Sequence, residues 1–510
     1  WPPFHLFLIV ALALAWGPVD AQDREAAGAD SIYRRPLGQD PETLDPARIW
    51  DIYSRSVAQQ VFDGLVQFDQ TLTIKPALAE FWRASRDGLI WTFDLRKGAR
   101  FHHGREVTSD DVVYSFTRIL DPKTRSGGAE LFLNVKGARD FREGRAKTVS
   151  GLAAPDRYTV RVTLEDAPVP FVSVLAVGHA KIVPRDVAEA QGDAFGSNPV
   201  GTGPFRLLRW QRGKEIVLTA NPDYFDGPPK LARLVYRIFP GDQRDAMYVE
   251  FLRGGIEDTP VPTRSDRRTL TTQANHIYVK RPMISARFYG YNARMMPLGD
   301  RRVRRAIVYA INREAIVQDV YLGQHAYAHG ILPPGTLGFN PQLAAYPFDP
   351  EKAKQLLAEA GYPGGRGLPP LAIWSSVQRE DILREHDQIK TWLAAVGIVA
   401  EIHYHTKWSS FSKMVEEGKL AMFLWAWYAD VPDPDNFLTK LFHSKSARNV
   451  FGYANPAVDN LLMSARASGD PQSRVELYRR AEQLILDDAP IVPVFHHTYE
   501  RLFQSYVRSV

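Results

Sequence analysis

The pattern of apolar and polar residues alternates between strand and helix periodicity from Ser31 to the end of the chain. Residues 89–96 alternate apolar and polar side chains with a period of two, which is typical of a half-buried strand. Residues 421–429 form a continuous apolar run, which indicates a strand buried on both faces. Strand and helix signals are interleaved throughout, so the pattern predicts an α/β or α+β fold.

Three helices are predicted from their N-caps and apolar stripes. The first begins at Thr108, with Asp111 at the spacing of a capping box. The second begins after Asp300, and the third begins after Asp349, with Pro350 in the first helical position. The residues expected on the buried faces of these helices are Val112, Phe116 and Ile119; Val303, Ala306, Ile307, Ala310 and Ile311; and Leu356, Leu357 and Ala360.

The apolar run of residues 4–16 has the length of a signal-peptide core and is too short to span a bilayer. Small residues around Ala21 resemble a cleavage site. We therefore expect residues 1–21 to be a signal peptide, Gln22 to begin the mature protein, and residues 22–30 to form a flexible leader. The protein is then exported to the periplasm.

The composition agrees with an exported globular protein. The chain has 510 residues, more than one compact core holds, so we expect two or more lobes. Hydrophobic residues make up 45% and charged residues 24%, which is ordinary for a globular protein. The sequence contains no cysteine, so the core alone must hold the fold together. Without a cysteine to carry a lipid, we expect the mature protein to be free in the periplasm.

The formal net charge of +5 is spread along the chain rather than clustered. The one dense group consists of Arg301, Arg302, Arg304 and Arg305. Nucleic-acid binding needs a basic stripe, and we interpret this group instead as the solvated face of a helix. We expect no nucleic-acid partner.

Candidate metal ligands are incomplete. His403 and His405 share one face of a predicted strand, which makes half a metal site, but no third ligand is spaced nearby. Asp430, Asp433 and Asp435 form an acidic cluster, but two prolines interrupt it and it lacks the glycine of a calcium loop. We expect neither a metal nor another cofactor.

Catalytic motifs are also missing from the sequence. We find no G-x-S-x-G nucleophile elbow and no P-loop. The chain has 58 acidic residues, and no pair among them is singled out as the two carboxylates of a glycosidase. The adjacent pairs His102–His103 and His496–His497 are interpreted as surface or pocket residues. A secreted hydrolase stays an alternative to a binding protein.

Several short motifs follow one another in a characteristic order from about Ser31 to the C-terminus. In this order they resemble the extracellular solute-binding proteins of the peptide/nickel type, family 5, which serve ABC importers. The likeness is closest to the oligopeptide- and dipeptide-binding members. The motifs are Leu44–Pro46, Val61–Leu65, Trp91–Arg96, Phe101–Gly104, Ser109–Val112, Asn198–Phe205, Asn221–Phe225, Asp300–Arg304, Ala310–Ile311, Trp427–Asp430 and Asp433–Pro434.

The resemblance implies a two-lobed α/β periplasmic binding protein (type II, cluster C-like) with a ligand cleft between its lobes. Residues 31–62 and 198–283, with 501–510 returning, are expected to form the first lobe. Residues 63–197 are expected to form an extra subdomain of this lobe. Residues 284–500 are expected to form the second lobe.

The resemblance also implies a set of ligand-binding residues. In peptide-binding relatives the aspartate of a W-x-x-D segment pairs with the α-ammonium of the ligand, and here that residue is Asp430. Trp427, Tyr428 and Ala429 are expected to supply adjacent backbone and wall, and Trp408 to line a pocket. A strand of the first lobe that flanks the ligand is matched by Trp50, Asp51, Ile52 and Tyr53.

A peptide is the expected ligand, because Asp430 favours an amine-bearing molecule. Other members of the family bind a nickel chelate, haem, an opine or an oligosaccharide, and these stay alternatives. Ala426 stands where the family often has glycine, and Leu424 where some oligopeptide binders carry arginine. The sequence therefore identifies no partner for the ligand C-terminus. We expect a monomeric, non-enzymatic protein that delivers its ligand to inner-membrane permease subunits.

Overall fold

The chain divides into two compact units. The N-terminal unit contains the described residues up to Ser265, Thr269–Val279 and the chain from Glu500 onward, and the C-terminal unit contains Arg267, Arg268 and Lys280–Tyr499. Among the described residues, no helix is both long and apolar enough to cross a membrane. The computed structural model describes residues 31–49, 51–166, 171–241, 243–262, 265, 267–273, 275–343, 346–429 and 431–508. The predicted signal peptide and leader lie outside these residues.

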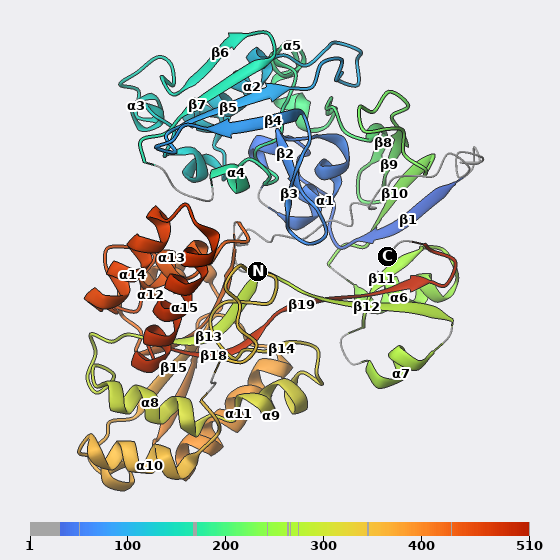
Figure 1. The fold of residues 1–510 in the computed structure, drawn as a ribbon. Helices are drawn as coiled ribbons and strands as arrows, with labels where there is room; N and C mark the ends of the chain where they lie inside the picture. The colour runs from blue at the N-terminus through green and yellow to red at the C-terminus, as the bar shows by residue number, and fades with distance from the viewer. Residues whose placement is uncertain are drawn as a thin grey trace. The chain divides into compact units, whose positions relative to one another are not determined.

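A four-stranded sheet with the order β1-β10-β9-β8 lies in the N-terminal unit (Figure 1). β1 pairs in parallel with β10, and the other pairs are antiparallel. One face of this sheet packs against helix α1, through Val57 and Val61 of the helix and Leu218 and Leu234 of the sheet. The bounds are β1 Ile32–Leu37, β8 Phe205–Gln211, β9 Glu215–Ala220, β10 Arg233–Ile238 and α1 Ile52–Val61.

A second sheet of the same unit has the strand order β4-β5-β7-β6 and is antiparallel throughout. Helix α2 lies beside this sheet. The strand predicted at residues 89–96 is confirmed as β5, in which Phe93 and Leu95 are buried. The helix predicted at Thr108 is confirmed as α2, which begins with the expected capping box and buries all three predicted apolar residues. The bounds are β4 Ala79–Ala84, β5 Ile90–Leu95, β6 Leu152–Asp156, β7 Thr159–Thr163 and α2 Ser109–Leu120.

Shorter elements complete the N-terminal unit. β2 pairs with β3, and β11, β19 and β12 form a three-stranded sheet in that order. β12 and β19 each cross the boundary between the units, at Val279/Lys280 and at Tyr499/Glu500. The bounds are β2 Val66–Phe68, β3 Ile74–Pro76, β11 Asp258–Pro260, β12 His276–Pro282, β19 Thr498–Gln504, α3 Ala138–Arg142, α4 Phe171–Val174, α5 Arg185–Gln191, α6 Arg244–Leu252 and α7 Arg267–Thr272.

The C-terminal unit is built on a six-stranded mixed sheet with the order β14-β18-β13-β17-β15-β16. Its core joins this sheet to helices α8, α10 and α11. The strands are β13 Ser285–Tyr291, β14 Ala326–Tyr327, β15 Leu371–Ser375, β16 Ala400–Tyr404, β17 Met422–Tyr428 and β18 Ile491–His496. The helices are α8 Arg301–Ala310, α9 Arg313–Ala315, α10 Pro350–Glu359, α11 Glu380–Ala395, α12 Trp408–Glu416, α13 Leu438–Phe442, α14 Pro456–Ala467 and α15 Pro471–Asp488.

Three predictions for this unit are confirmed. The apolar run at 421–429 is the buried central strand β17. Asp300 caps α8 by accepting a hydrogen bond from the Arg302 N–H at 2.8 Å, and Asp349 caps α10 by accepting one from Lys352 at 2.9 Å. The apolar stripes predicted for both helices are buried, except Ala360, which is half-buried.

The prediction that the arginine cluster forms a solvated helix face is wrong for Arg304. Its guanidinium is buried and satisfies carbonyl groups at the end of α15 and in the turn before α8. Charge patterning does not reveal these acceptors, because they are backbone carbonyl groups, and two of them lie more than 180 positions further along the chain. The accepting carbonyls and their distances are Leu298 (2.8 Å), Gly299 (3.1 Å), Asp488 (2.6 Å) and Ala489 (3.2 Å).

Three of the motifs in the N-terminal unit meet at the buried carboxylate of Asp63. It accepts hydrogen bonds from the Thr202 hydroxyl at 2.8 Å and the Tyr224 hydroxyl at 3.2 Å. Burial raises the pKa of Asp63, and the positive charge of Lys181 opposes this shift. The node joins the segments 61–65, 198–205 and 221–225, which explains their occurrence together.

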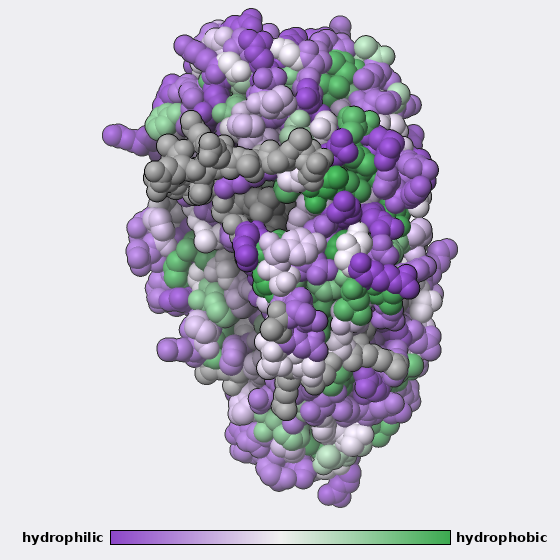
Figure 2. All heavy atoms as spheres, turned by 90° about the vertical axis from the view of Figure 1, so that its right-hand side faces the viewer, coloured by the Kyte–Doolittle hydropathy of each residue, from purple (hydrophilic) through white to green (hydrophobic). Residues whose placement is uncertain are grey.

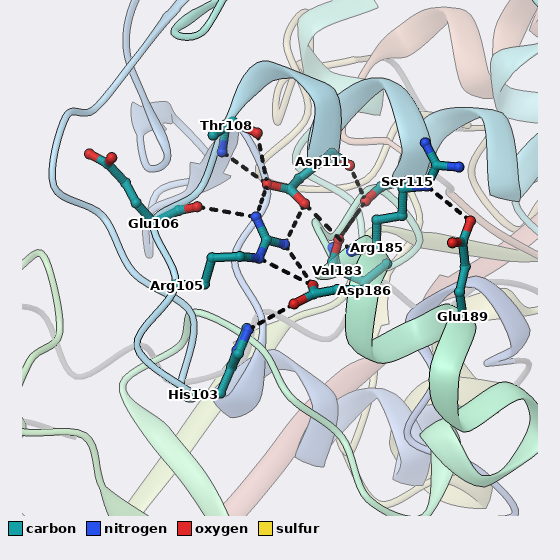
Figure 3. A network of polar contacts seen from close by, with 10 residues as sticks. All are labelled: His103, Arg105, Glu106, Thr108, Asp111, Ser115, Val183, Arg185, Asp186 and Glu189. Carbon is teal, nitrogen blue, oxygen red and sulfur yellow. Dashed lines mark hydrogen bonds and ion pairs between the residues drawn. The ribbon is translucent and has the colours of Figure 1, made fainter.

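A second polar node joins the start of α2 to the loop before it and to α5 (Figure 3). The Arg105 guanidinium donates to both carboxylate oxygens of Asp111, at 2.9 and 2.7 Å, and to Asp186 at 2.9 Å. His103 lies 3.3 Å from Asp186. His102 is partly buried, and its ring lies 3.0 Å from the Gly203 carbonyl oxygen. Burial lowers the pKa of His102 to about 4, so this ring is a neutral structural group.

Hydrophilic side chains predominate on the face shown in Figure 2, with hydrophobic side chains interspersed. Single exposed hydrophobic residues such as Leu208, Val249 and Leu252 are ordinary for a globular surface. No function is therefore required to explain them.

Candidate functional site

The predicted ligand-binding segment lies at the end of β17, in the middle of the sheet of the C-terminal unit. β17 is antiparallel to β13 and parallel to β15. Its pairing continues beyond Tyr428, because the Ala429 N–H donates to the Ile284 carbonyl oxygen at 2.9 Å. Asp430 and Trp50 lie outside the described residues.

Trp427 and Tyr428 point to opposite faces of the sheet, as successive residues of a strand do. Trp427 is buried, and its indole N–H donates to the Asn436 side-chain oxygen at 3.1 Å. The Lys440 ammonium lies 5.3 Å from the centre of the Trp427 ring. Trp427 thus anchors the segment from one face, while Tyr428 is only partly buried on the other.

Trp408 belongs to an aromatic cluster beside the same strand. It is the first residue of α12, and its ring centre lies 4.9 Å from that of Trp425 and 6.0 Å from that of Phe411. Trp425 is two residues before Trp427 and therefore lies on the same face of β17. The structure thus brings Trp408 to the strand that carries the predicted segment.

The turn after β17 is held by a buried ion pair. The Asp433 carboxylate accepts hydrogen bonds from the Arg474 guanidinium at 2.6 and 2.9 Å, and both residues are buried. Asp435 accepts a hydrogen bond from the Tyr478 hydroxyl at 3.2 Å and lies 3.2 Å from the Arg466 side chain. Two of the three carboxylates in the acidic cluster therefore have structural partners.

The Tyr428 hydroxyl forms a hydrogen bond with His497 Nε2 at 3.1 Å, and His497 Nδ1 forms one with the Ser285 hydroxyl at 3.0 Å. Burial lowers the pKa of His497 to about 3, so the imidazole is neutral. Burial also raises the pKa of Tyr428. A chain of neutral hydrogen-bonding groups therefore holds this face of the segment.

A buried charged cluster lies on the same face of the sheet as Tyr428. Glu385 of α11 is fully buried, and its carboxylate accepts from Arg287 at 2.8 Å, from Tyr289 at 2.7 Å and from Tyr321 at 2.6 Å. None of the motifs found in the sequence includes this cluster. The alternation of Arg287, Tyr289 and Tyr291 along β13 is a signal that places polar groups on one buried face.

Arg379, the N-cap residue of α11, was also missed. Its side chain is 66% exposed and lies 2.7 Å from the Asp381 carboxylate. Burial is the largest cause of the raised pKa of Tyr428, and the positive charge of Arg379 opposes it. Burial is also the largest cause of the lowered pKa of His497, and the charge of Arg379 acts in the same direction. Arg379 therefore presents an exposed cation at the start of α11.

The prediction that residues 50–53 form a strand is wrong for its described part. Asp51 is the N-cap of α1, and its carboxylate accepts from the Ser54 N–H at 2.7 Å and the Ser54 hydroxyl at 2.5 Å. Ile52 and Tyr53 form the first turn of the helix. The cap decides the structure here, because a carboxylate that satisfies free N–H groups stabilises a helix start.

The two histidines considered as metal ligands have other surroundings. His403 stacks on Trp374 at 4.6 Å between ring centres, and its Nε2 lies 3.8 Å from the Glu401 carboxylate. His405 follows the end of β16, and its N–H donates to the Ser375 carbonyl oxygen. In the part of the chain that the structure describes, no three His, Asp or Glu side chains are grouped to hold a metal.

Comparison with known families and proteins identifies the family of the chain. The model of the bacterial extracellular solute-binding proteins, family 5, matches residues 73–449. The chain belongs to this family. The dipeptide-binding protein of Escherichia coli is 31% identical to this family 5 member over 487 residues, which cover 91% of this chain and 88% of that protein. The haem-binding protein A of Haemophilus influenzae is 31% identical over 485 residues, with 91% and 86% covered.

Solved structures of family 5 proteins share the fold. The unliganded open form of the murein tripeptide-binding protein MppA superposes with a TM-score of 0.81 at 26% identity, covering 93% of both chains. DppA of Helicobacter pylori, in complex with the peptide STSA, gives a TM-score of 0.73 at 29% identity, covering 94% of both chains. The predicted fold class, that of an α/β two-lobed periplasmic binding protein, is therefore confirmed, as is the resemblance to family 5.

Proposed function

We propose that this family 5 member is the peptide-capturing component of an ABC importer. The observation that carries the proposal is the position of Trp427–Ala429 at the end of the central strand β17, with Asp430 next in the chain. The similarity to proteins named as dipeptide-binding and di/tripeptide-binding supports it.

Asp430 is proposed to pair with the α-ammonium of the ligand. A buried ammonium needs a counter-ion, because an unpaired buried charge costs several kcal/mol. Asp433 and Asp435 are engaged by Arg474, Tyr478 and Arg466, so Asp430 is the member of the cluster proposed to meet a cation from outside. Trp427, Tyr428, Ala429 and Trp408 are proposed to form the adjacent backbone and wall.

The ligand carboxylate is proposed to meet Arg379. Its guanidinium is exposed at the start of α11 and lies 2.7 Å from the carboxylate of the half-buried Asp381. A guanidinium matches a carboxylate with two parallel hydrogen bonds. Backbone groups at the end of β17 are proposed to pair with the ligand main chain as an added strand does, which needs no particular peptide sequence.

The remaining proposals concern the protein's context. We propose that residues 1–21 direct export to the periplasm, that the mature chain is a monomer, and that it delivers ligand to inner-membrane permease subunits. The lobe boundaries of 31–62 with 198–283, 63–197 and 284–500, and a contribution of Trp50 to Tyr53, stay proposals as well. No catalytic role is proposed, since the relatives reported above are named as binding proteins.

Haem is the second candidate ligand. The similarity to haem-binding protein A of Haemophilus influenzae favours it. An absorbance titration with haem distinguishes the two ligands, because a peptide site produces no change in the haem spectrum.

The test of the peptide proposal is calorimetry on Asp430→Asn with a free peptide and with its N-acetylated form. Losing one partner of a buried charged pair lowers affinity by about 30- to 4,000-fold, or roughly 2–5 kcal/mol. The acetylated peptide should bind the native protein poorly and lose little more on the variant. Asp435→Asn is the matched control and should keep the preference for a free N-terminus. Additive losses of affinity from the Asp430→Asn substitution and from N-acetylation of the peptide would exclude the ion pair.

A further inference from the structure

The chain passes between its two units along two neighbouring strands, β12 and β19. β12 leads into β13 after Pro282, and β18 leads into β19 through His497 (Figure 1). Any movement of one unit against the other must therefore act on these two connections. The contacts that the two strands make at their ends in the C-terminal unit determine how tightly the strands are bound to that unit.

Both connections are joined to each other by Ser285 and His497. The Met283 N–H donates to the His497 carbonyl oxygen at 2.8 Å, and the His497 N–H donates to the Ser285 hydroxyl at 3.1 Å. His496 Nδ1 lies 2.8 Å from the Ser285 carbonyl oxygen. Backbone and side-chain hydrogen bonds thus clamp the first residues of β13 to the last residues of β18.

One turn holds both strands as well. Lys280, at the unit boundary in β12, donates from Nζ to the Gly323 carbonyl oxygen at 2.5 Å. Thr498, the first residue of β19, donates from its hydroxyl to the carbonyl oxygen of Gln324. The next residue, His325, packs with its ring centre 5.2 Å from that of His497. The ends of β12 and β19 in the C-terminal unit are therefore both held by residues 323–325.

The His497 imidazole links this region to the proposed ligand segment. Nδ1 bonds with the Ser285 hydroxyl at 3.0 Å, and Nε2 bonds with the Tyr428 hydroxyl at 3.1 Å. The ring stacks on Tyr428 at 5.0 Å and meets Phe495 edge-on at 5.1 Å between ring centres. A neutral imidazole has one donor and one acceptor nitrogen, and the two hydroxyls use both. The ring therefore has one well-defined position.

We infer that His497 is a positioning residue that couples the ligand-binding segment to the strands connecting the two units. This inference rests on the proposed function, because Tyr428 lies two residues before Asp430. The Tyr428 backbone also pairs directly opposite Ser285 in the sheet. A ligand that moves the end of β17 therefore also moves the imidazole whose hydrogen bonds join β13 to β18.

Histidine offers two substitutions that separate its two bonds. In His497→Asn the amide takes the place of Nδ1, which keeps the Ser285 side and loses the Tyr428 side. In His497→Gln the longer amide takes the place of Nε2, which keeps the Tyr428 side. Tyr428→Phe removes the same link as His497→Asn while leaving the stacked ring. Tyr453→Phe is a matched control, because its hydroxyl bonds with Asp488 at 2.8 Å, outside this contact network.

The experiment measures peptide affinity by calorimetry and peptide-induced compaction by small-angle scattering for these four variants and for the double variant that combines Tyr428→Phe with His497→Asn. Tyr428→Phe and His497→Asn should each lower affinity about five-fold, the effect of one buried hydrogen bond, and should reduce the compaction. The double variant should lose no more than either single variant, because both remove one link. His497→Gln and Tyr453→Phe should keep native affinity and compaction.

The outcomes that overturn the inference are distinct from failure of the proposed function. If the native protein binds peptide but Tyr428→Phe and His497→Asn keep native affinity and compaction, the coupling role is wrong. Lower urea stability alone, without either effect, assigns these contacts a purely structural role and also overturns it. If the native protein binds no peptide at all, the proposed function fails, and the inference fails with it.

Discussion

At the residue scale, the buried carboxyl group of Glu482 on α15 has an unusual environment. One of its oxygens accepts hydrogen bonds from the Ile331 N–H at 2.7 Å and the Leu332 N–H at 2.9 Å. The residue is only 1% exposed. Burial raises the pKa of Glu482 from 4.5 to about 7, against the opposing effect of the two N–H groups. Glu482 therefore fastens the loop after β14 to α15 in a pH-dependent way.

We predict that the contribution of Glu482 to stability falls as pH rises from about 4.5 to about 7. In this window the folded protein keeps a proton that the unfolded chain has released, so each rise in pH favours unfolding. A shift from 4.5 to about 7 corresponds to a loss of roughly 3 kcal/mol across the window. Urea unfolding of the native protein at a series of pH values from 4 to 8 measures the slope.

Glu482→Gln keeps the shape and removes the titration, so it is the control for this prediction. The difference in unfolding free energy between the native protein and this variant should change with pH in the stated direction. Curves that stay parallel from pH 4 to pH 8 would show that Glu482 does not titrate in this range.

Other polar residues show why residue-scale chemistry is difficult to predict from sequence. Asp433 and Asp435 appear in the sequence as a cluster of acids, but the structure pairs them with residues about 40 positions further along the chain. Arg304 appears among exposed arginines and instead satisfies backbone carbonyls. Asp433, Asp435 and Arg304 each have at least one partner distant in sequence, and no local pattern contains that partner.

At the element scale, helix starts were the most predictable features. Thr108 and Asp349 act through hydrogen bonds to residues three positions away, and such contacts are visible in the sequence itself. Asp51 uses the same chemistry, but the resemblance to a strand of relatives led to the wrong assignment there. Central strand β17 was predictable because a strand buried on both faces is apolar throughout.

The segment 198–205 makes a tight contact with the end of α1, and this contact requires glycine. A Cβ atom at Gly201 would lie 2.0 Å from the Val61 carbonyl oxygen, which is backbone and cannot move freely. We predict that Gly201→Ala destabilises the protein by about 3 kcal/mol or more, because overpacking forces the backbone apart. Urea unfolding measures the loss.

Gly469→Ala is the matched control for Gly201→Ala. A Cβ atom there would meet nothing within 4 Å, so this variant should unfold near the native urea midpoint. Equal midpoints for the two variants would mean that segment 198–205 moves away from α1 without penalty, contrary to the contact described.

At the scale of the whole molecule, the division of the chain into two units is the feature that the proposed function uses. β12 and β19 are neighbouring strands that both pass from one unit to the other. Two-lobed binding proteins close around their ligands by hinge motion. Family 5 structures include an unliganded open form and a peptide complex, so both states are represented among the relatives.

We predict that the radius of gyration falls when the protein is saturated with a peptide ligand. The physical reason is that a ligand shifts the population toward the state that binds it better, which in two-lobed binding proteins is the closed state. Small-angle scattering with and without peptide measures the change, and a peptide that calorimetry shows not to bind is the control. An unchanged radius with bound peptide would mean that the units do not close.

The sequence by itself predicted the helices that begin after Thr108, Asp300 and Asp349, the strands β5 and β17, and the resemblance to family 5, because caps, periodicity and short motifs depend on residues close together in the chain. Tertiary structure alone decided which buried polar groups are partners. Asp433 meets Arg474 across 41 positions, and Tyr428 meets His497 across 69. Such pairs form when packing removes water from both groups. Each group then has the other as its available hydrogen-bonding partner. The contacts around the proposed ligand segment are therefore a property of the fold.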